Sequence, residues 1–176
     1  MDYRRFRHRG GTYFFTVVTY QRQPLLVTHI ERLRHAFRTV RRRRPFAIEA
    51  VVVLPDHLHA IWRLPEDDAD FSGRWQQIKR LFSAGIEPRL SASPSRQGKR
   101  EKSIWQRRFW EHAIRDDGDW RRHVDYIHFN PVRHGYAMSP GAWSYSSFRR
   151  AVRQVWYAAD WGSSEPVAGL EGMDVE

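Results

Sequence analysis

The sequence of 176 residues contains no cysteine. This absence excludes disulfides, thiolate metal sites and cysteine nucleophiles, and it suits a reducing compartment. No apolar run approaches the roughly 20 residues that cross a bilayer. The opening residues, MDYRRFR, also lack the apolar stretch of a signal peptide. We therefore expect a cytoplasmic protein with no membrane partner.

Lysine is also scarce, because only Lys79, Lys99 and Lys102 stand among 30 basic residues, so that arginine supplies the net charge of +10. Residues 1–153 hold all 30 basic residues and 15 of the 20 acidic ones, a net +15, whereas residues 154–176 carry −5. Arginine favours planar, bidentate binding of phosphate. The charge predicts a polyanionic partner, and the alternative is a solvated basic surface.

Hydropathy predicts one α+β domain over residues 1–153 and an acidic, flexible tail over 154–176. The predicted strands and helices, in chain order, are strand 12–20, helix 29–44, strands 46–54 and 57–64, helix 71–86, strand 108–115 and helix 119–129. Segment 87–103, rich in Ser, Pro, Arg and Gly, predicts a basic loop. Pro131 disfavours helical geometry at Asn130, and the chain is expected to be irregular from Pro140 onward. This is the ferredoxin-like β-α-β-β-α-β order with one antiparallel sheet, followed by a further helix.

His57-Leu58-His59 lies at the start of a predicted strand. Residues two apart on a strand share a face, so both imidazoles project together. Two neutral imidazoles at that spacing can bind one divalent cation. A pair of surface histidines, or of histidines satisfied within the core, is the alternative interpretation.

Tyr126 and Asn130 are four residues apart near the end of the last predicted helix, so they are neighbours on one helical face. The Asn130 amide oxygen can complete a metal site begun by His57 and His59. Such nitrogen and oxygen ligands suit Mg²⁺ or Mn²⁺, and histidine also suits Zn²⁺. Tyr126 is then a candidate nucleophile toward phosphorus. The alternatives are a packed aromatic ring for Tyr126 and a helix cap for Asn130.

Several ordered motifs together resemble the REP-associated tyrosine transposases, bacterial relatives of the single-tyrosine HUH transposases. The resemblance spans roughly residues 3 to 161. Its motifs are YRR at 3–5, FFTV at 14–17, VVLPDHLH at 52–59, IWQRRFWEH at 104–112, VDYIHFNPVRHG at 124–135 and WSYSSF at 143–148. The segment 87–103 is longer and more basic than is usual in the family, and the tail beyond Trp161 has no counterpart.

The resemblance implies that residues 1–153 form a single-tyrosine HUH transposase domain. Such a domain is a metal-dependent single-stranded DNA endonuclease and strand transferase. Tyr126 would form a 5′-phosphotyrosine link, and His57, His59 and Asn130 would bind the metal. The implied partner is a repeated extragenic palindrome (REP) hairpin with a flanking single-stranded tetranucleotide. The enzyme is expected to be associated with the bacterial nucleoid and to be a monomer, with a dimer as the alternative.

Two other interpretations stay open at this point. A replication-initiator or relaxase nuclease commonly has a Lys on the tyrosine helix, and no Lys follows Lys102. A non-catalytic DNA-hairpin-binding protein is the alternative from another class.

His128 is expected at the surface or against DNA. A further hypothesis is that the acidic tail folds over the DNA-binding surface and lowers activity.

The clusters of basic and aromatic residues are the expected DNA contacts, since such interleaving suits phosphate binding beside base stacking. The alternative for each basic residue is that it lies on a solvated surface and makes no specific contact with DNA. The expected contacts are Arg4, Arg5, Arg7, Arg41, Arg42, Arg43, Arg44, Lys79, Arg80, Trp105, Arg107 and Arg108.

Overall fold

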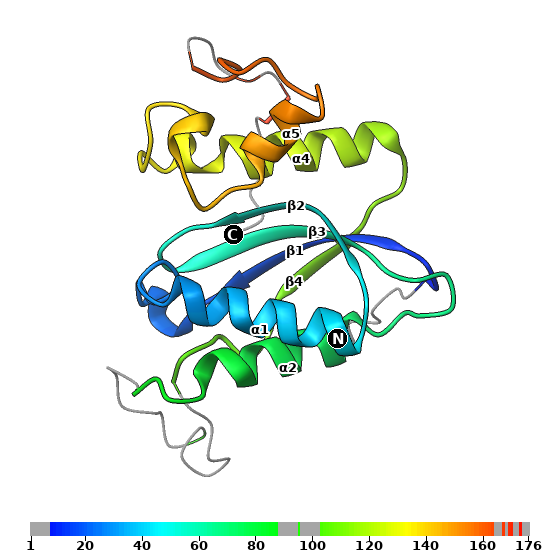
Figure 1. Ribbon diagram of the computed structural model, residues 1–176, viewed down its shortest axis with the longest axis vertical. Coiled ribbons are helices and arrows are strands. Elements are labelled where there is room, and N and C mark those ends of the chain that lie inside the picture. Colours follow the sequence, from blue (N-terminus) through cyan, green and yellow to red (C-terminus); the bar gives the residue numbers. More distant parts are fainter. Residues whose placement is uncertain are drawn as a thin grey trace.

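One four-stranded antiparallel sheet separates two layers of helices in the computed structural model (Figure 1). The structure describes residues 8–87, 95, 103–163, 167, 169–170 and 173. The strands are β1 (Thr12–Val18), β2 (Ala47–Val53), β3 (His57–Arg63) and β4 (Trp110–Ala113), in the order β2-β3-β1-β4. The helices are α1 (Ile30–Arg43), α2 (Phe71–Ser83), α4 (Asp117–Arg133) and α5 (Phe148–Arg153), with single 3-10 turns η1 (Tyr20–Arg22) and η2 (Pro140–Ala142). The expected α+β fold with one antiparallel sheet is confirmed.

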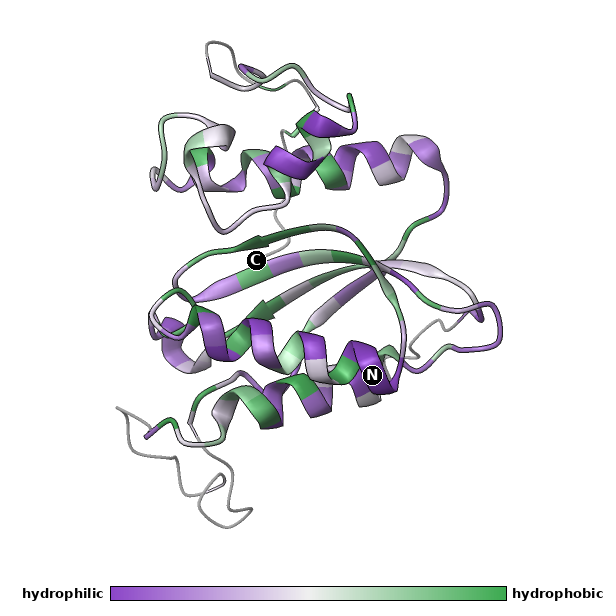
Figure 2. Ribbon diagram, viewed as in Figure 1, coloured by the Kyte–Doolittle hydropathy of each residue, from purple (hydrophilic) through white to green (hydrophobic). Residues whose placement is uncertain are grey.

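The sheet is buried on both faces, with α1 and α2 on one side and α4 and α5 on the other (Figure 1). Phe15 and Val17 of β1 belong to the core on the α1 and α2 side, whereas Phe14 belongs to the core beneath α4. A strand that is buried on both faces does not need to alternate polar and apolar residues, which explains the apolar run in β1. The strands are correspondingly the most hydrophobic layer in Figure 2.

Helix α4 continues through Pro131 to Arg133, so the end expected near Phe129 is wrong. Proline lacks an N–H and cannot donate to the preceding turn, but this loss is tolerable one turn from a helix end. The Pro131 carbonyl accepts a bond of 2.8 Å from the Tyr136 N–H, which stabilises the chain just after the helix. Asn130 is therefore a helical residue and not a cap.

The chain after Pro140 is more ordered than expected, because it contains α5 and a packed segment beyond it. Tyr157 is only 6% exposed, and its ring lies 4.4 Å from that of Trp161 and 5.4 Å from that of Phe148. The Tyr157 hydroxyl donates to Asp125 Oδ1 of α4 at 2.5 Å. A flexible tail starting at residue 154 is therefore wrong for the residues up to Trp161, which are held by aromatic packing. The expected basic loop 87–103 falls almost entirely outside the described residues.

Candidate active site

His57 and His59 lie on β3 and face α4. The register pairs His59 with Thr16 and His57 with Val18 of β1. His59 and Phe14 share the face that packs beneath α4, with ring centroids 5.5 Å apart. Both histidines are buried, at 1% and 0% exposed, and their ring centroids are 5.0 Å apart. The prediction that the two imidazoles share a face is confirmed by this geometry.

Each imidazole is oriented through its Nδ1 atom. His57 Nδ1 lies 2.6 Å from Asp56 Oδ1, and His59 Nδ1 lies 2.9 Å from Thr16 Oγ1. Burial alone would raise the pKa of Asp56, but hydrogen bonds from His57 and Arg22 lower it on balance, so Asp56 stays a carboxylate. Because Nδ1 is engaged in both rings, Nε2 is the atom that each ring can offer to a metal ion. A partner on the other ring nitrogen is the usual arrangement for metal-binding histidines.

Helix α4 and its C-cap residue His134 place three polar side chains over β3 at intervals of four residues. The Tyr126 ring lies 5.2 Å from that of His59, and the His134 ring lies 5.1 Å from that of His57. Asn130 is midway between Tyr126 and His134 on the same helical face. The geometry thus brings together the four residues that sequence reasoning singled out, and it adds His134.

Asn130 shows that this site suits a metal ion. Its side chain is fully buried, and neither Oδ1 nor Nδ2 has a hydrogen-bond partner among the described residues. A buried amide without partners costs free energy and calls for an explanation, such as an ion that is bound in the working protein. Two imidazole nitrogens and one amide oxygen form a mixed donor set that fits a divalent cation.

The Tyr126 side chain is buried, and its ring is close to an aromatic and a cationic side chain. Its side chain is 1% exposed, and its ring lies 6.1 Å from that of Phe14. The Arg133 guanidinium lies 5.3 Å from the ring centroid, and Arg133 Nη1 donates to the Met173 carbonyl at 2.9 Å. The positive charge next to the phenol favours binding of an anionic phosphate at this position.

His134 was not among the site residues predicted from the sequence. A signal was present, because His134 follows Asn130 by four residues and therefore shares its helical face. The expected helix end near Phe129 hid that relation. Only the continuation of α4 through Pro131 places His134 beside His57.

His128 does not lie at the surface or toward DNA as expected. It is fully buried, and its Nε2 atom is 2.9 Å from Ser147 Oγ at the start of α5. Burial lowers the pKa of His128 to about 3, so the ring is neutral and can accept this hydrogen bond. The physical reason is that α5 covers the face of α4 on which His128 lies.

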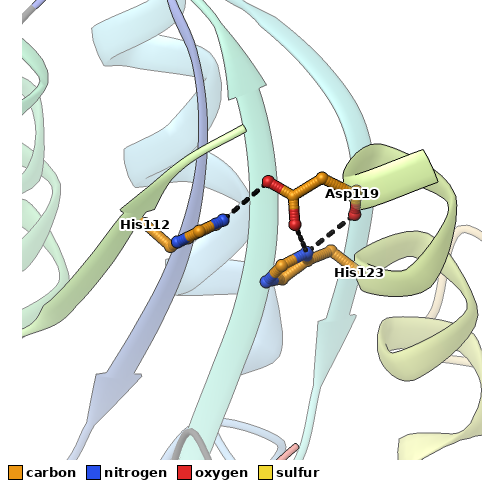
Figure 3. Close-up of side chains that lie close together, drawn as sticks. All are labelled: His112, Asp119 and His123. Carbon is orange, nitrogen blue, oxygen red and sulfur yellow. Dashed lines mark hydrogen bonds and ion pairs between the residues drawn. The ribbon is translucent and has the colours of Figure 1, made fainter. Parts of the chain in front are cut away.

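A second group of polar side chains joins β4 to the start of α4, as Figure 3 shows. His112 Nε2 donates to Asp119 Oδ2 at 2.8 Å, and His123 Nδ1 donates to the Asp119 carbonyl at 2.8 Å. Burial alone would raise the pKa of the Asp119 carboxyl, but the hydrogen bonds from His112 and from the Arg115 N–H lower it far below its usual range.

The three ligand atoms of His112, Asp119 and His123 lie within 4.8 Å of one another, which is close enough for a metal ion. The two imidazoles are stacked, however, with centroids 4.7 Å apart and planes inclined by 15°. Nearly parallel rings cannot both direct an in-plane nitrogen at one ion. We therefore interpret the group as a hydrogen-bonded link. It holds His123, one turn before Tyr126, against Phe14 at 4.7 Å.

The predicted DNA contacts that the structure describes do not gather around Tyr126. Arg4, Arg5 and Arg7 lie outside the described residues. Arg41 to Arg44 end α1 on the opposite face of the sheet. They precede the start of β2, which pairs with Arg63 at the far end of β3 from His57. Arg44 is also paired with Asp70 at 2.7 Å.

The remaining predicted contacts lie on α2 and in the segment before β4. Trp105 is only 6% exposed and its ring packs 5.0 Å from that of Phe82, so the expected base stacking is wrong for this residue. Lys79 donates to the Gln106 carbonyl at 3.0 Å. Arg80, Arg107 and Arg108 are exposed. In this segment the aromatic rings turn inward to the core and the arginines turn outward.

None of the helices in the described part of the chain is both long and apolar enough to span a membrane.

Comparison with known proteins gives a consistent result, although no protein-family model matches the chain. The chain is 48% identical over 163 residues to a REP-associated tyrosine transposase of Escherichia coli (strain K12), covering 91% of this chain and 90% of that protein. It is 42% identical over 165 residues to a putative REP-associated tyrosine transposase of Haemophilus influenzae, covering 93% and 94%.

A solved structure of a REP-associated tyrosine transposase bound to a REP hairpin matches with a TM-score of 0.82 and 44% identity, over 99% of this chain and 96% of that one. The sequence motifs, the sheet order and these similarities agree: the chain belongs to the REP-associated tyrosine transposases.

Proposed function

We propose that this protein is a metal-dependent endonuclease and strand transferase that cleaves one DNA strand at REP hairpins through a 5′-phosphotyrosine on Tyr126. The observation that carries the proposal is the placement of the Tyr126 ring 5.2 Å from that of His59. Tyr126 is also one helical turn from the buried Asn130 amide, which has no hydrogen-bond partner in the described part of the chain. The homologous structure that holds a REP hairpin supports the choice of DNA partner.

His57, His59 and Asn130 would hold Mg²⁺ or Mn²⁺. When bound, such an ion polarises a non-bridging phosphate oxygen and makes phosphorus more electrophilic. The chain's own residues position the reacting groups. Asp56 and Thr16 hold the imidazoles, and α4 holds the Tyr126 ring against β3.

In the proposed cleavage, Tyr126 Oη loses its proton and attacks phosphorus, forming one P–O bond. The bond from phosphorus to the 3′ oxygen breaks, and that oxygen takes up a proton to become a 3′-hydroxyl. One phosphodiester is exchanged for another, so the energy of the bond is kept. The reverse attack by a 3′-hydroxyl rejoins the strands and frees Tyr126 without a nucleotide cofactor.

The direct test is to trap the covalent intermediate. A labelled REP hairpin with single-stranded flanks is incubated with the full chain and Mg²⁺ or Mn²⁺, and the products are separated under denaturing conditions. We expect a metal-dependent protein–DNA adduct whose peptide, identified by mass spectrometry, contains Tyr126. Hairpin binding that is equal with and without metal, with no adduct on any hairpin, would instead support the non-catalytic hairpin-binding protein.

We propose that the working unit is a monomer of the nucleoid. The outer edge of β2 is paired within the chain: the Val53 N–H donates to the Tyr145 carbonyl, and the Ser147 N–H donates to the Val51 carbonyl, both at 2.8 Å. Ser146 also forms a bridge with Val52. A covered edge strand cannot pair with the sheet of a second copy. This pairing closes the β2 edge of the sheet to a second copy, and on that ground it supports the monomer over the dimer.

We also propose that the end of the chain lowers activity. Arg133, which lies over the Tyr126 ring, donates to the Met173 carbonyl, and Leu170 and Met173 pack against the core that includes Tyr126. Removal of residues 164–176 deletes four acidic residues and this contact while keeping Trp161.

We expect this truncated protein to bind hairpin DNA more tightly at low salt and to form the adduct faster. The difference in affinity should shrink as salt screens the lost charges. The measurement is a salt series of hairpin affinities with the full chain alongside. Equal affinities and rates at every salt concentration would refute an inhibitory tail.

A further inference from the structure

Three rings form a row that leads away from the active site, and we name His134, Tyr136 and Trp143 the aromatic row. The His134 ring lies 5.1 Å from that of His57, and the Tyr136 ring is stacked on His134 at 6.1 Å with an angle of 28°. The Trp143 ring follows at 5.7 Å from Tyr136. The row thus runs without a break from a proposed metal ligand to the surface. Its backbone follows the end of α4 in Figure 1.

Two hydrogen bonds hold the row in place. The Tyr136 N–H donates to the Pro131 carbonyl at 2.8 Å, and Trp143 Nε1 donates to the Val53 carbonyl at 2.9 Å. Rings fixed in this way lose little further entropy when a flat partner stacks on them. The row is therefore preorganised for a planar ligand.

The middle ring of the row, Tyr136, is open to solvent. Tyr136 is 44% exposed, and among the described residues only Trp110, at 40%, is another aromatic side chain exposed to this degree. Exposed aromatic rings on a rigid support are the means by which proteins hold unpaired bases. The exposed Arg133, three residues before Tyr136, adds a positive charge of the sign that a phosphate requires.

We propose, on the basis of the function proposed above, that the aromatic row binds an unpaired base of the single strand next to the scissile phosphate, with Tyr136 as the stacking ring. A base within the hairpin stem already stacks on its neighbours and cannot offer its face to Tyr136. The row would therefore act on the single-stranded flank and not on the stem. It would hold the strand so that the phosphate reaches Tyr126.

The test compares Tyr136→Ala with Tyr136→Phe, which keeps the ring, and with Met138→Ala. Met138 is 90% exposed on the same segment and has no ring, so it serves as the matched control. The probes are a REP hairpin with a four-nucleotide single-stranded flank, carrying 2-aminopurine at each flank position in turn, and the same hairpin without the flank. Affinity and 2-aminopurine fluorescence are measured without divalent metal, so that no strand is cleaved.

We expect the wild-type protein to quench 2-aminopurine at one flank position or more. Tyr136→Ala should abolish this quenching and weaken binding of the flanked hairpin about fivefold or more, the lower end of the effect of losing one base-stacking ring. Tyr136→Phe and Met138→Ala should match the wild type, and all proteins should bind the unflanked hairpin alike.

Quenching that persists in Tyr136→Ala, or equal losses on the two hairpins, would overturn the assignment of the row. The same holds if the wild type binds both hairpins equally and quenches nothing. The adduct assay keeps the two proposals apart. An adduct on Tyr126 with an unaffected Tyr136→Ala variant rejects only the row, whereas ring-dependent quenching without any adduct rejects only the catalysis.

Discussion

Tyr126→Phe is expected to abolish DNA cleavage and adduct formation while leaving hairpin affinity within about twofold of wild type. Phenylalanine keeps the ring that contacts Phe14, His59 and Arg133. Only the hydroxyl oxygen is lost, and that oxygen is the proposed nucleophile. Removal of a nucleophile lowers turnover by at least about 10³-fold where no other group can replace it. The measurement is cleavage of labelled hairpin under single-turnover conditions.

Tyr157→Phe is a matched control for this variant. Tyr157 is a second buried tyrosine in the same core, and its hydroxyl donates to Asp125 Oδ1. Burial and Asp125 raise the pKa of Tyr157 well above its usual range, which makes it a poor nucleophile. This variant should cleave as wild type does and lose about 1 kcal/mol of stability with its hydrogen bond. Cleavage by Tyr126→Phe, or its absence in Tyr157→Phe, would contradict the assignment of the nucleophile.

Asn130→Leu is expected to change stability and activity in opposite directions. In metal-free protein the variant should be as stable as wild type or more stable, by about 1 kcal/mol, because it removes a buried amide that has no hydrogen-bond partner among the described residues. Cleavage with Mg²⁺ or Mn²⁺ should fall at least about 100-fold, since metal ligation loses its oxygen donor. The rise in Tm that added metal causes in wild type should also disappear.

Asn130→Asp provides the complementary test. Its carboxylate still offers an oxygen to the metal, so cleavage in Mn²⁺ should be largely retained. Without metal, however, the variant buries a charge in place of an amide and should be less stable than wild type. A metal-induced rise in Tm in Asn130→Leu equal to that of wild type would show that Asn130 is not a ligand. So would destabilisation of metal-free Asn130→Leu together with full cleavage.

Much of the candidate site follows from local spacing. The period of two along a strand places His57 and His59 on one face, and the helical period places Asn130 beside Tyr126. These relations depend only on backbone geometry within one element. The order of the elements along the chain could be predicted as well, because apolar runs and turn residues separate them.

Predictions from the sequence were wrong where contacts with a distant segment override a local sequence preference. Pro131 favours a helix end, yet α4 continues to Arg133, and Tyr136 bonds to the Pro131 carbonyl. Trp105 has the spacing of a stacking residue, but the core beside Phe82 takes up its ring. His128 is covered by α5, a helix too short for periodicity to reveal.

By itself, the sequence determined the family, the order of the elements, and the pairing of His57 with His59 and of Tyr126 with Asn130. Only the tertiary structure decided that α4 lies over β3, so that the two pairs meet and His134 joins them. It also decided that residues 145–147 cover the edge of β2 and that Tyr157 and Trp161 belong to the core. The physical reason is the sequence separation over which each effect acts. Backbone periodicity relates residues that are a few positions apart, whereas the burial of a side chain depends on segments that meet only after the whole chain has packed.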